Sequence, residues 1–303
     1  MRGISSLAAA LVLLAACAPD VPAASPSPSP SPSPSSSAPP ARPVVGGCLS
    51  TTGRVQYGGK GDPIASPIDC AEPHQLEVVK TAAFPAGAAV PSWGSADLRA
   101  AYADCAAAAS AYVGIDFHLG WLFVHVGRPD STAWAAGDHA YVCGVAETES
   151  TNWLAVVLPR SGSLKGARAT GSGLVFSRCA QVSGDQPDAD GFYQTITGEY
   201  RVDCATAHDA ELAGVIELPD GPFPEWQAQA DYAEPRCIKA IAARLGLSES
   251  AFLRRGDIAR YTTTLDNEHQ WSAGDRVLRC YAVVPSDHLF TGTLEGLGAK
   301  PLP

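Results

Sequence analysis

Two histidine–carboxylate pairs with the same spacing are the residues whose types could carry out chemistry in this chain. His74 is followed by Glu77, and His208 is followed by Glu211. A histidine near a carboxylate can transfer protons or bind a ligand, and it can equally be a structural residue whose tautomer the carboxylate fixes. Duplicated catalytic centres are uncommon, whereas duplicated framework is natural. We therefore favour the structural interpretation and treat the four residues as a candidate polar site.

A metal site is an alternative for the same region, since Cys70 lies shortly before His74 and the second pair repeats this arrangement. Zinc sites usually take closely spaced pairs of ligands, whereas the other cysteines of this chain are tens of residues away. His118 and His125 lie on a strand-like run at an odd spacing, which would place them on opposite faces. We therefore expect no metal and no other cofactor.

Sequence signatures of common enzyme classes are missing. The chain has no G-x-S-x-G, H-E-x-x-H, G-x-x-x-x-G-K-[ST] or G-x-G-x-x-G pattern. A Ser/His/Asp triad assembled from distant positions stays open, because such triads are defined in space. We lean towards a protein that is not an enzyme, and keep a hydrolase that uses His74 or His208 as an alternative.

The N-terminal residues have the features of an export signal. Arg2 precedes an apolar stretch, residues 4–16, that is too short to cross a bilayer. The stretch ends in L-A-A-C at 14–17, which resembles the lipobox of bacterial lipoproteins. That resemblance implies that the peptide is cut after residue 16 and that Cys17 becomes an N-terminus carrying acyl chains such as palmitate. Ordinary secretion with cleavage near the same place is the alternative.

The lipidated cysteine is followed by a linker, so that residues 17–43 form one segment. Residues 18–43 hold ten prolines and eight serines, a composition that favours extended polyproline II chain with a reach on the order of 80 Å. The formal net charge of the whole chain is -10. This charge disfavours nucleic-acid binding and charge-driven attachment to anionic lipid or teichoic polymers. We therefore expect membrane contact only through the lipid anchor.

The cysteines indicate an oxidising compartment. There are nine, and acylation of one leaves eight, which can pair completely. The eight divide equally between two halves of the chain, and four cysteines allow three pairings in each half. We favour the first with the second and the third with the fourth, because the third lies on a predicted helix that a bond to the last strand would hold to its sheet. The expected disulfides are Cys48–Cys70, Cys105–Cys143, Cys179–Cys204 and Cys237–Cys280.

The chain after the linker contains an internal repeat. Residues 69–87 and 203–221 align without a gap, and seven of nineteen positions are identical. Further markers recur in register: a tryptophan before a helix (Trp93, Trp226), W-x-A-G-D (134–138, 271–275) and a closing G-[ST]-L-x-G (162–166, 292–296). We therefore expect a signal peptide (1–16), the lipidated cysteine and linker (17–43), a first module (44–171) and a second module (172–303).

Each module is predicted to be a small α+β unit with strands, one helix and further strands. In the first module, apolar residues recur at alternating spacings of four and three and form one stripe that faces a core. The stripe consists of Leu98, Tyr102, Cys105, Ala109 and Tyr112.

The ends of this helix and its counterpart are marked differently. Ser95 is a predicted N-cap and Gly114 a predicted C-terminal end. In the second module Pro235 lies two residues before Cys237, and we expect that helix to begin late or to kink there. Strands are expected at 121–126 and, in the second module, near 258–264.

Three motifs of the first module resemble the septum-formation domain family of actinobacterial envelope proteins. They are D-C-A-E-P-H-x-x-E (69–77), W-A-A-G-D-x-x-x-x-C (134–143) and G-S-L-K-G (162–166). The second module matches less well, because Thr206 and Ala207 replace the Glu-Pro. The family name reflects an association with cell division, without an established activity. The resemblance therefore implies a fold and an envelope setting rather than a reaction.

Together these features favour a lipid-anchored, extracytoplasmic binding or scaffolding protein on the outer face of the cytoplasmic membrane, linked to septum formation. Its partner would be a division or envelope protein, or a cell-wall polymer. A hydrolase that acts on the cell wall and a metal or small-ligand sensor are the alternatives.

Overall fold

The structure is a computed structural model, and it describes residues 43–50, 66–92, 94–151, 156–170, 173–193, 195–265 and 268–303. The chain divides into two units, residues 1–40 and 41–303, and all described residues belong to the second. The predicted signal peptide, Cys17, almost all of the linker and Trp93 lie outside the described residues. The predictions made for them stay predictions.

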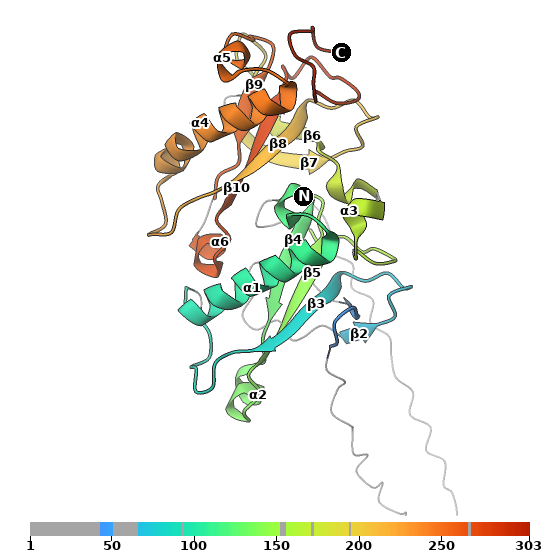
Figure 1. The fold of residues 1–303 in the computed structure, drawn as a ribbon, viewed down its shortest axis with the longest axis vertical. Helices are drawn as coiled ribbons and strands as arrows, with labels where there is room; N and C mark the ends of the chain where they lie inside the picture. The colour runs from blue at the N-terminus through green and yellow to red at the C-terminus, as the bar shows by residue number, and fades with distance from the viewer. Residues whose placement is uncertain are drawn as a thin grey trace, which may run out of the picture. The chain divides into compact units, whose positions relative to one another are not determined.

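Two five-stranded antiparallel sheets with the same strand order form the frame (Figure 1). The first has the order β2 (Ser66–Ile68), β1 (Cys48–Ser50), β3 (Leu76–Ala83), β5 (Ala140–Glu147), β4 (Leu122–Gly127). The second has the order β7 (Ile196–Arg201), β6 (Cys179–Gly184), β8 (Ala210–Glu217), β10 (Val277–Val283), β9 (Ala259–Thr262). The expected α+β class is confirmed, and the internal repeat of the sequence has a counterpart in the two sheets.

The strand registers repeat as well. Cys48 of β1 lies opposite Glu77 of β3, and Cys179 of β6 lies opposite Glu211 of β8. Each first cysteine therefore sits beside the carboxylate of the candidate polar site in the same sheet.

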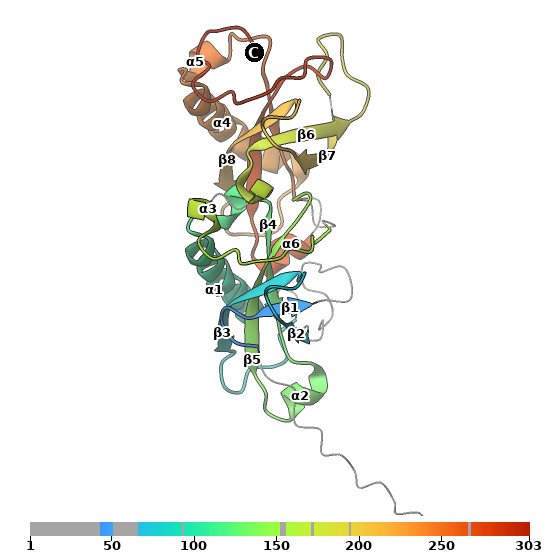
Figure 2. The same cartoon turned by 90° about the vertical axis from the view of Figure 1, so that its right-hand side faces the viewer.

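Strand β5 shows how one strand supplies cores on both faces of its sheet. Tyr141, Cys143 and Val145 belong to the cluster packed under helix α1 (Ala96–Val113), whereas Val142 and Ala146 belong to a cluster on the opposite face. Successive side chains of a strand point to opposite faces, so this alternation is expected when both faces are covered. In Figure 2, α1 and α4 (Trp226–Leu245) each lie along one face of their own sheet.

Helix α1 has the predicted ends. The Ser95 hydroxyl accepts a hydrogen bond from the Leu98 backbone N–H, and Gly114 ends the helix in the left-handed conformation with φ 88°. Of the predicted stripe, Leu98, Tyr102, Cys105 and Ala109 are buried and Tyr112 is half-buried.

Helix α4 differs from its prediction. It begins at Trp226 and runs through Pro235, nine residues further on, so the expected late start is wrong. Proline lacks the N–H that an interior helical position donates, but the residues on both sides of Pro235 hold the helix in place. Ala233 and Cys237 are fully buried, and Cys237 is bonded to the sheet. Tertiary packing here overrides the local signal.

The remaining helices are short: η1 (Phe117–Leu119), α2 (Ser131–Ala135), α3 (Ala167–Thr170), η2 (Gly173–Phe176), α5 (Glu249–Phe252) and α6 (Glu268–Ala273). His118 lies in η1, so the strand-like run expected to hold both His118 and His125 is wrong; only His125 is on a strand, β4. Among the described residues, no helix combines the length and apolar character needed to cross a membrane.

The eight cysteines of the described residues form four disulfides with the favoured pairing. Their Cα–Cα distances of 5.0 to 5.3 Å lie within the usual range. In each half one bond joins the long helix to the sheet, and the other joins the first strand to the segment that precedes the histidine. The bonds are Cys48–Cys70, Cys105–Cys143, Cys179–Cys204 and Cys237–Cys280.

Replacing the exposed Pro235 with alanine is expected to stabilise the protein by about 1–2 kcal/mol. The substitution restores an interior N–H donor, and this gain exceeds the loss of proline's restriction of the unfolded chain. Chemical denaturation of Pro235→Ala measures the change, with Lys239→Ala on an exposed position of the same helix as the matched control. A lower free energy of unfolding for Pro235→Ala alone would contradict this account of α4.

Candidate functional site

Glu77 is a fully buried carboxylate surrounded by hydrogen-bond donors. Its Oε1 accepts from the Leu164 backbone N–H at 2.7 Å, and its Oε2 accepts from the Ser163 hydroxyl at 2.7 Å and the Tyr112 hydroxyl at 2.9 Å. The Arg160 Nε lies 3.6 Å from Oε1 and supplies positive charge. We call this set, Glu77 with Tyr112, Arg160, Ser163 and Leu164, the Glu77 cluster.

Glu211 occupies the same position in the second half and is 1% exposed. Its Oε2 accepts from the Leu294 backbone N–H at 2.5 Å, and its Oε1 accepts from the Thr293 hydroxyl at 2.8 Å. The Arg244 Nε donates to Oε1 at 2.8 Å, and a second nitrogen of the same guanidinium also contacts it. Glu211, Arg244, Thr293 and Leu294 form the Glu211 cluster.

The two clusters draw their charge compensation from different elements. Tyr112 and Arg244 hold equivalent places, each two residues before the glycine that ends the long helix. Arg160 and Phe290 also hold equivalent places, since each forms a β-bridge with the histidine of its half. The first half therefore uses a helix hydroxyl and a loop guanidinium, whereas the second uses a helix guanidinium and has a phenyl ring in the loop.

The clusters explain the closing G-[ST]-L-x-G signature. The hydroxyl group and the leucine N–H of this signature donate hydrogen bonds to the buried carboxylate of the same half. Its first glycine has a positive φ in both halves, 78° at Gly162 and 93° at Gly292, where side chains are strained. The N–H of that glycine donates a hydrogen bond to the backbone carbonyl of the second cysteine of the same half. The distances are 3.1 Å from Gly162 to Cys70 and 2.6 Å from Gly292 to Cys204. The signature is a loop that caps the carboxylate.

The histidines of the candidate polar site are fully buried. The His74 Nδ1 contacts the Glu72 carbonyl at 2.9 Å, and its Nε2 lies 3.4 Å from Glu77 Oε1. His208 makes the same Nδ1 contact with the Thr206 carbonyl at 2.7 Å, but its Nε2 has no hydrogen-bond partner among the described residues. Its ring instead packs 4.1 Å from that of Phe290. The structure brings His74 to Glu77, and it does not hydrogen-bond His208 to Glu211.

This geometry leaves little room for chemistry at the histidines. Cys70 and Cys204 are in disulfides, so they offer no thiolate to a metal. Within the described ranges, no group of three or more His, Cys, Asp or Glu side chains is placed to hold a metal ion. The structural interpretation of both histidines stays a prediction.

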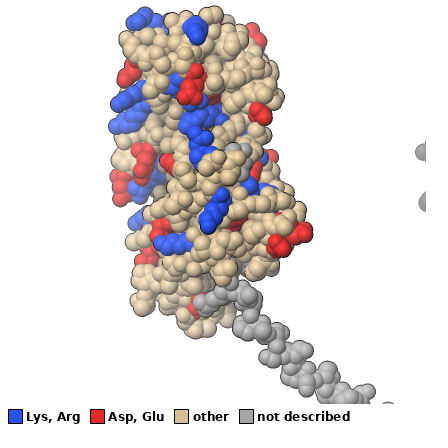
Figure 3. Space-filling model, turned by 45° about the vertical axis from the view of Figure 1, so that its right-hand side comes forward, with Lys and Arg blue, Asp and Glu red and all other residues tan. Residues whose placement is uncertain are grey.

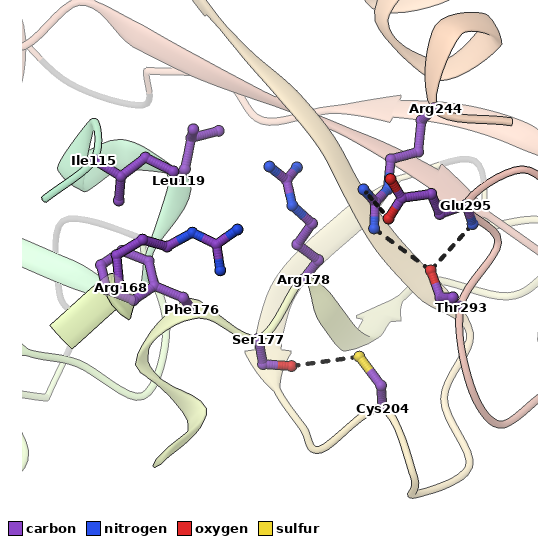
Figure 4. Close-up of a pocket in the computed structure, with 10 residues that line it drawn as sticks. All are labelled: Ile115, Leu119, Arg168, Phe176, Ser177, Arg178, Cys204, Arg244, Thr293 and Glu295. Carbon is purple, nitrogen blue, oxygen red and sulfur yellow. Dashed lines mark hydrogen bonds and ion pairs between the residues drawn. The ribbon is translucent and has the colours of Figure 1, made fainter. Parts of the chain in front are cut away.

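A cavity of about 460 Å³ lies beside the Glu211 cluster (Figure 4). Three arginines and one glutamate line it together with apolar and small polar residues, and we call it the arginine pocket. The lining residues are Arg168, Arg178, Arg244, Glu295, Ile115, Leu119, Phe176, Ser177, Thr293 and Cys204.

The charge in this pocket is unevenly compensated. Arg244 pairs with Glu211 and, at 2.8 Å, with Glu295. Burial lowers the pKa of the Arg178 guanidinium, and the positive charges of Arg244 and Arg168 lower it further, against the raising effect of Glu211 and Glu295. Figure 3 turns forward the side on which α3 lies in Figure 1, and basic side chains gather there although the chain is acidic overall. The pocket can attract an anion.

The two halves also exchange core residues. Trp121, 2% exposed, packs among residues of the second sheet and donates from Nε1 to the Ser177 carbonyl at 2.8 Å. In return Ala273 of α6 packs in the core under α1. Each half therefore completes part of the other's core.

Comparison with known proteins gives one result. The family model described as septum formation matches residues 45–280, more than half of the 303 residues. The chain belongs to the septum-formation family. The match runs through both sheets as one span, so a boundary between two family copies near residue 171 stays a prediction. No curated protein and no solved structure matches.

Sequence reasoning found part of this family member's polar network and missed the rest. It singled out both glutamates and the closing signature, but it did not connect them, because their separation exceeds 80 residues. It assigned Tyr112 only to a core stripe. It missed Arg168 and Arg178. Both flank motifs that occur in each half, and the other half has no arginine at these positions, which was the available signal.

Removing the helix residue that donates to the buried glutamate is expected to lower the free energy of unfolding more in the second half of the septum-formation protein than in the first. Arg244→Ala leaves Glu211 buried without its ion-pair partner, and we expect a loss of about 3–5 kcal/mol in the free energy of unfolding. Tyr112→Phe removes one hydroxyl while Arg160 remains near Glu77, and we expect about 1 kcal/mol. Urea denaturation of both variants tests this. Equal losses in the free energy of unfolding would contradict the conclusion that Glu77 and Glu211 are charge-compensated from different elements.

A histidine between the halves makes stability depend on pH. The His118 Nδ1 lies 2.8 Å from Asp116, its Nε2 lies 3.5 Å from Asp275 after α6, and its carbonyl accepts from Arg279 of β10. Burial lowers the pKa of His118, but the contacts with Asp116 and Asp275 outweigh it, so the pKa is raised above about 6.5.

Because the folded pKa of His118 is raised, its stabilising contribution is complete below about pH 6.5 and is lost as pH rises through the folded value. The free energy of unfolding lost on His118→Gln should therefore be larger at pH 6 than at pH 9. The exposed His288, changed to glutamine, is the matched control. A loss that does not vary with pH would show that His118 is neutral in the folded protein.

Proposed function

We propose that this septum-formation protein is a lipid-anchored binding or scaffolding protein of the cell envelope, held on the outer face of the cytoplasmic membrane. The observation that carries the proposal is the complete pairing of the eight cysteines in residues 43–303. Disulfides persist in oxidising compartments and are rare in the cytoplasm. A chain with four of them supports a place outside the cytoplasm.

The anchor rests on the ninth cysteine. Cys17 follows a short apolar stretch in a lipobox-like sequence, and it has no cysteine left to pair with in the described part of the chain. Acylation would account for it. The proline- and serine-rich linker would then hold the folded unit away from the membrane surface, within reach of division proteins or the cell wall.

The polar clusters favour binding over hydrolysis. A general base must come within hydrogen-bonding reach of its substrate, directly or through one water. His74 and His208 are fully buried, and the oxygens of Glu77 and Glu211 already accept bonds from the loop that covers them. These residues therefore support a rigid frame, and the partner is expected on the surface.

The anchor is tested with Cys17→Ala in the full chain. We expect the protein to carry labelled palmitate and to fractionate with membranes, and Cys17→Ala to lose the label and leave the membrane fraction. Titration under denaturing conditions should find no free thiol in the acylated protein. Unchanged membrane association of Cys17→Ala, or several free thiols, would overturn the proposal.

Binding is tested by affinity capture from envelope extracts with the full chain, and with the anchor and linker alone (residues 1–43) as control. Enrichment of a division protein or wall polymer over that control is the expected result. Digestion of purified peptidoglycan that is lost in His74→Ala or His208→Ala, while both variants keep the folded protein's circular dichroism, would establish the hydrolase instead.

A further inference from the structure

Two of the three arginines in the arginine pocket have no carboxylate partner among the described residues. Arg178 is half-buried and donates one nitrogen to the Leu212 carbonyl at 3.0 Å, which leaves its other N–H groups available. Arg168 is exposed and makes no side-chain hydrogen bond or ion pair with the described residues. Figure 4 shows both guanidinium groups directed into the same space. Unlike Arg244, neither is explained by the buried Glu211.

The internal repeat supplies a control for these positions. Arg178 immediately precedes the first cysteine of its half, and the corresponding residue before Cys48 is Gly47. Arg168 lies two residues after the closing signature, and the corresponding residue in the second half is Gly298. Both arginines therefore stand where the other copy of the same frame has glycine. The frame does not require them, and a separate role accounts for them better.

Apolar side chains also line the pocket. They are Ile115, Leu119 and Phe176, and in Figure 4 Phe176 lies beside Arg168. Its volume of about 460 Å³ lies within the range of small-molecule sites, roughly 300–1,000 Å³. A ligand that combines a compact anion with an uncharged body matches this lining.

We infer that the arginine pocket binds a phosphate group, either free or as a monoester, through Arg168 and Arg178. Planar guanidinium groups match the oxygens of phosphate and can bind them in a bidentate manner. A monoester carries about −1.5 to −2 charges at neutral pH, enough to compensate two arginines, whereas a carboxylate carries one. Free phosphate and a phosphorylated sugar share this chemistry. The site lies wholly in the folded unit, so it goes beyond the proposed function and does not depend on the anchor.

The test is isothermal titration of the purified full chain, in neutral detergent, with inorganic phosphate, glucose 1-phosphate and acetate. We expect glucose 1-phosphate and phosphate to bind and acetate to bind at least tenfold more weakly. Arg168→Gln and Arg178→Gln should each weaken phosphate binding by about 10- to 100-fold, as expected for loss of hydrogen bonds to a charged group. The matched control is Arg254→Gln, an exposed arginine outside the pocket.

Each result of the titrations either supports or overturns the inference. Binding of inorganic phosphate as tightly as glucose 1-phosphate would assign the site to free phosphate, and tighter binding of the ester would assign it to a phosphorylated sugar; both support the inference. Arg168→Gln keeps the test valid if Arg178→Gln unfolds, since Arg168 makes no described polar contact. No binding of either phosphate at millimolar concentration, equal binding of acetate, or unchanged affinity in Arg168→Gln would overturn it.

Discussion

The burial of one carboxylate in each half is the constraint on which the rest of the fold depends. A charged carboxylate placed in a protein interior without partners costs several kcal/mol, so Glu77 and Glu211 are tolerated only where donors surround them. Those donors come from the end of the long helix and from a loop more than 80 residues along the chain. Satisfying the charge therefore requires strand, helix and closing loop to meet, and the disulfide beside each carboxylate holds the strand that borders it.

The two halves meet this constraint with different residues at the helix position and at the loop position. In the first half Tyr112 and Arg160 complete the shell of Glu77, and in the second Arg244 acts from the helix while Phe290 packs on the histidine. Exchanging one position alone would leave a carboxylate without a nearby cation or would place two cations around one carboxylate. Both are unfavourable in a buried site. The helix position and the loop position must therefore change together.

The sequence predicted the structure correctly wherever a local pattern of residues determines it. The N-cap and C-cap of α1, the strands that carry repeated cysteines and the four disulfide pairs followed from spacing and residue type. It failed where distant contacts decide. Helix α4 continues through Pro235 because buried residues on both sides are held by the sheet, and His118 lies in a short 3-10 helix rather than on a strand. No local sequence pattern indicates that Trp121 and Ala273 each pack in the core of the other half.

Repetition separates framework from function in this molecule. The buried glutamates occur at equivalent positions in both halves, and the donors around them account for their burial. Positions that differ in charge between the copies and do not contact a buried carboxylate are not required by the shared frame, and Arg168 and Arg178 are the clearest of these in the arginine pocket. Glu211 and Glu295 offset part of the charge, but two guanidinium groups kept close together without carboxylate partners of their own still repel each other. A frame that tolerates this cost at the junction of its two halves, in an acidic chain, is suited to recognising an anion there.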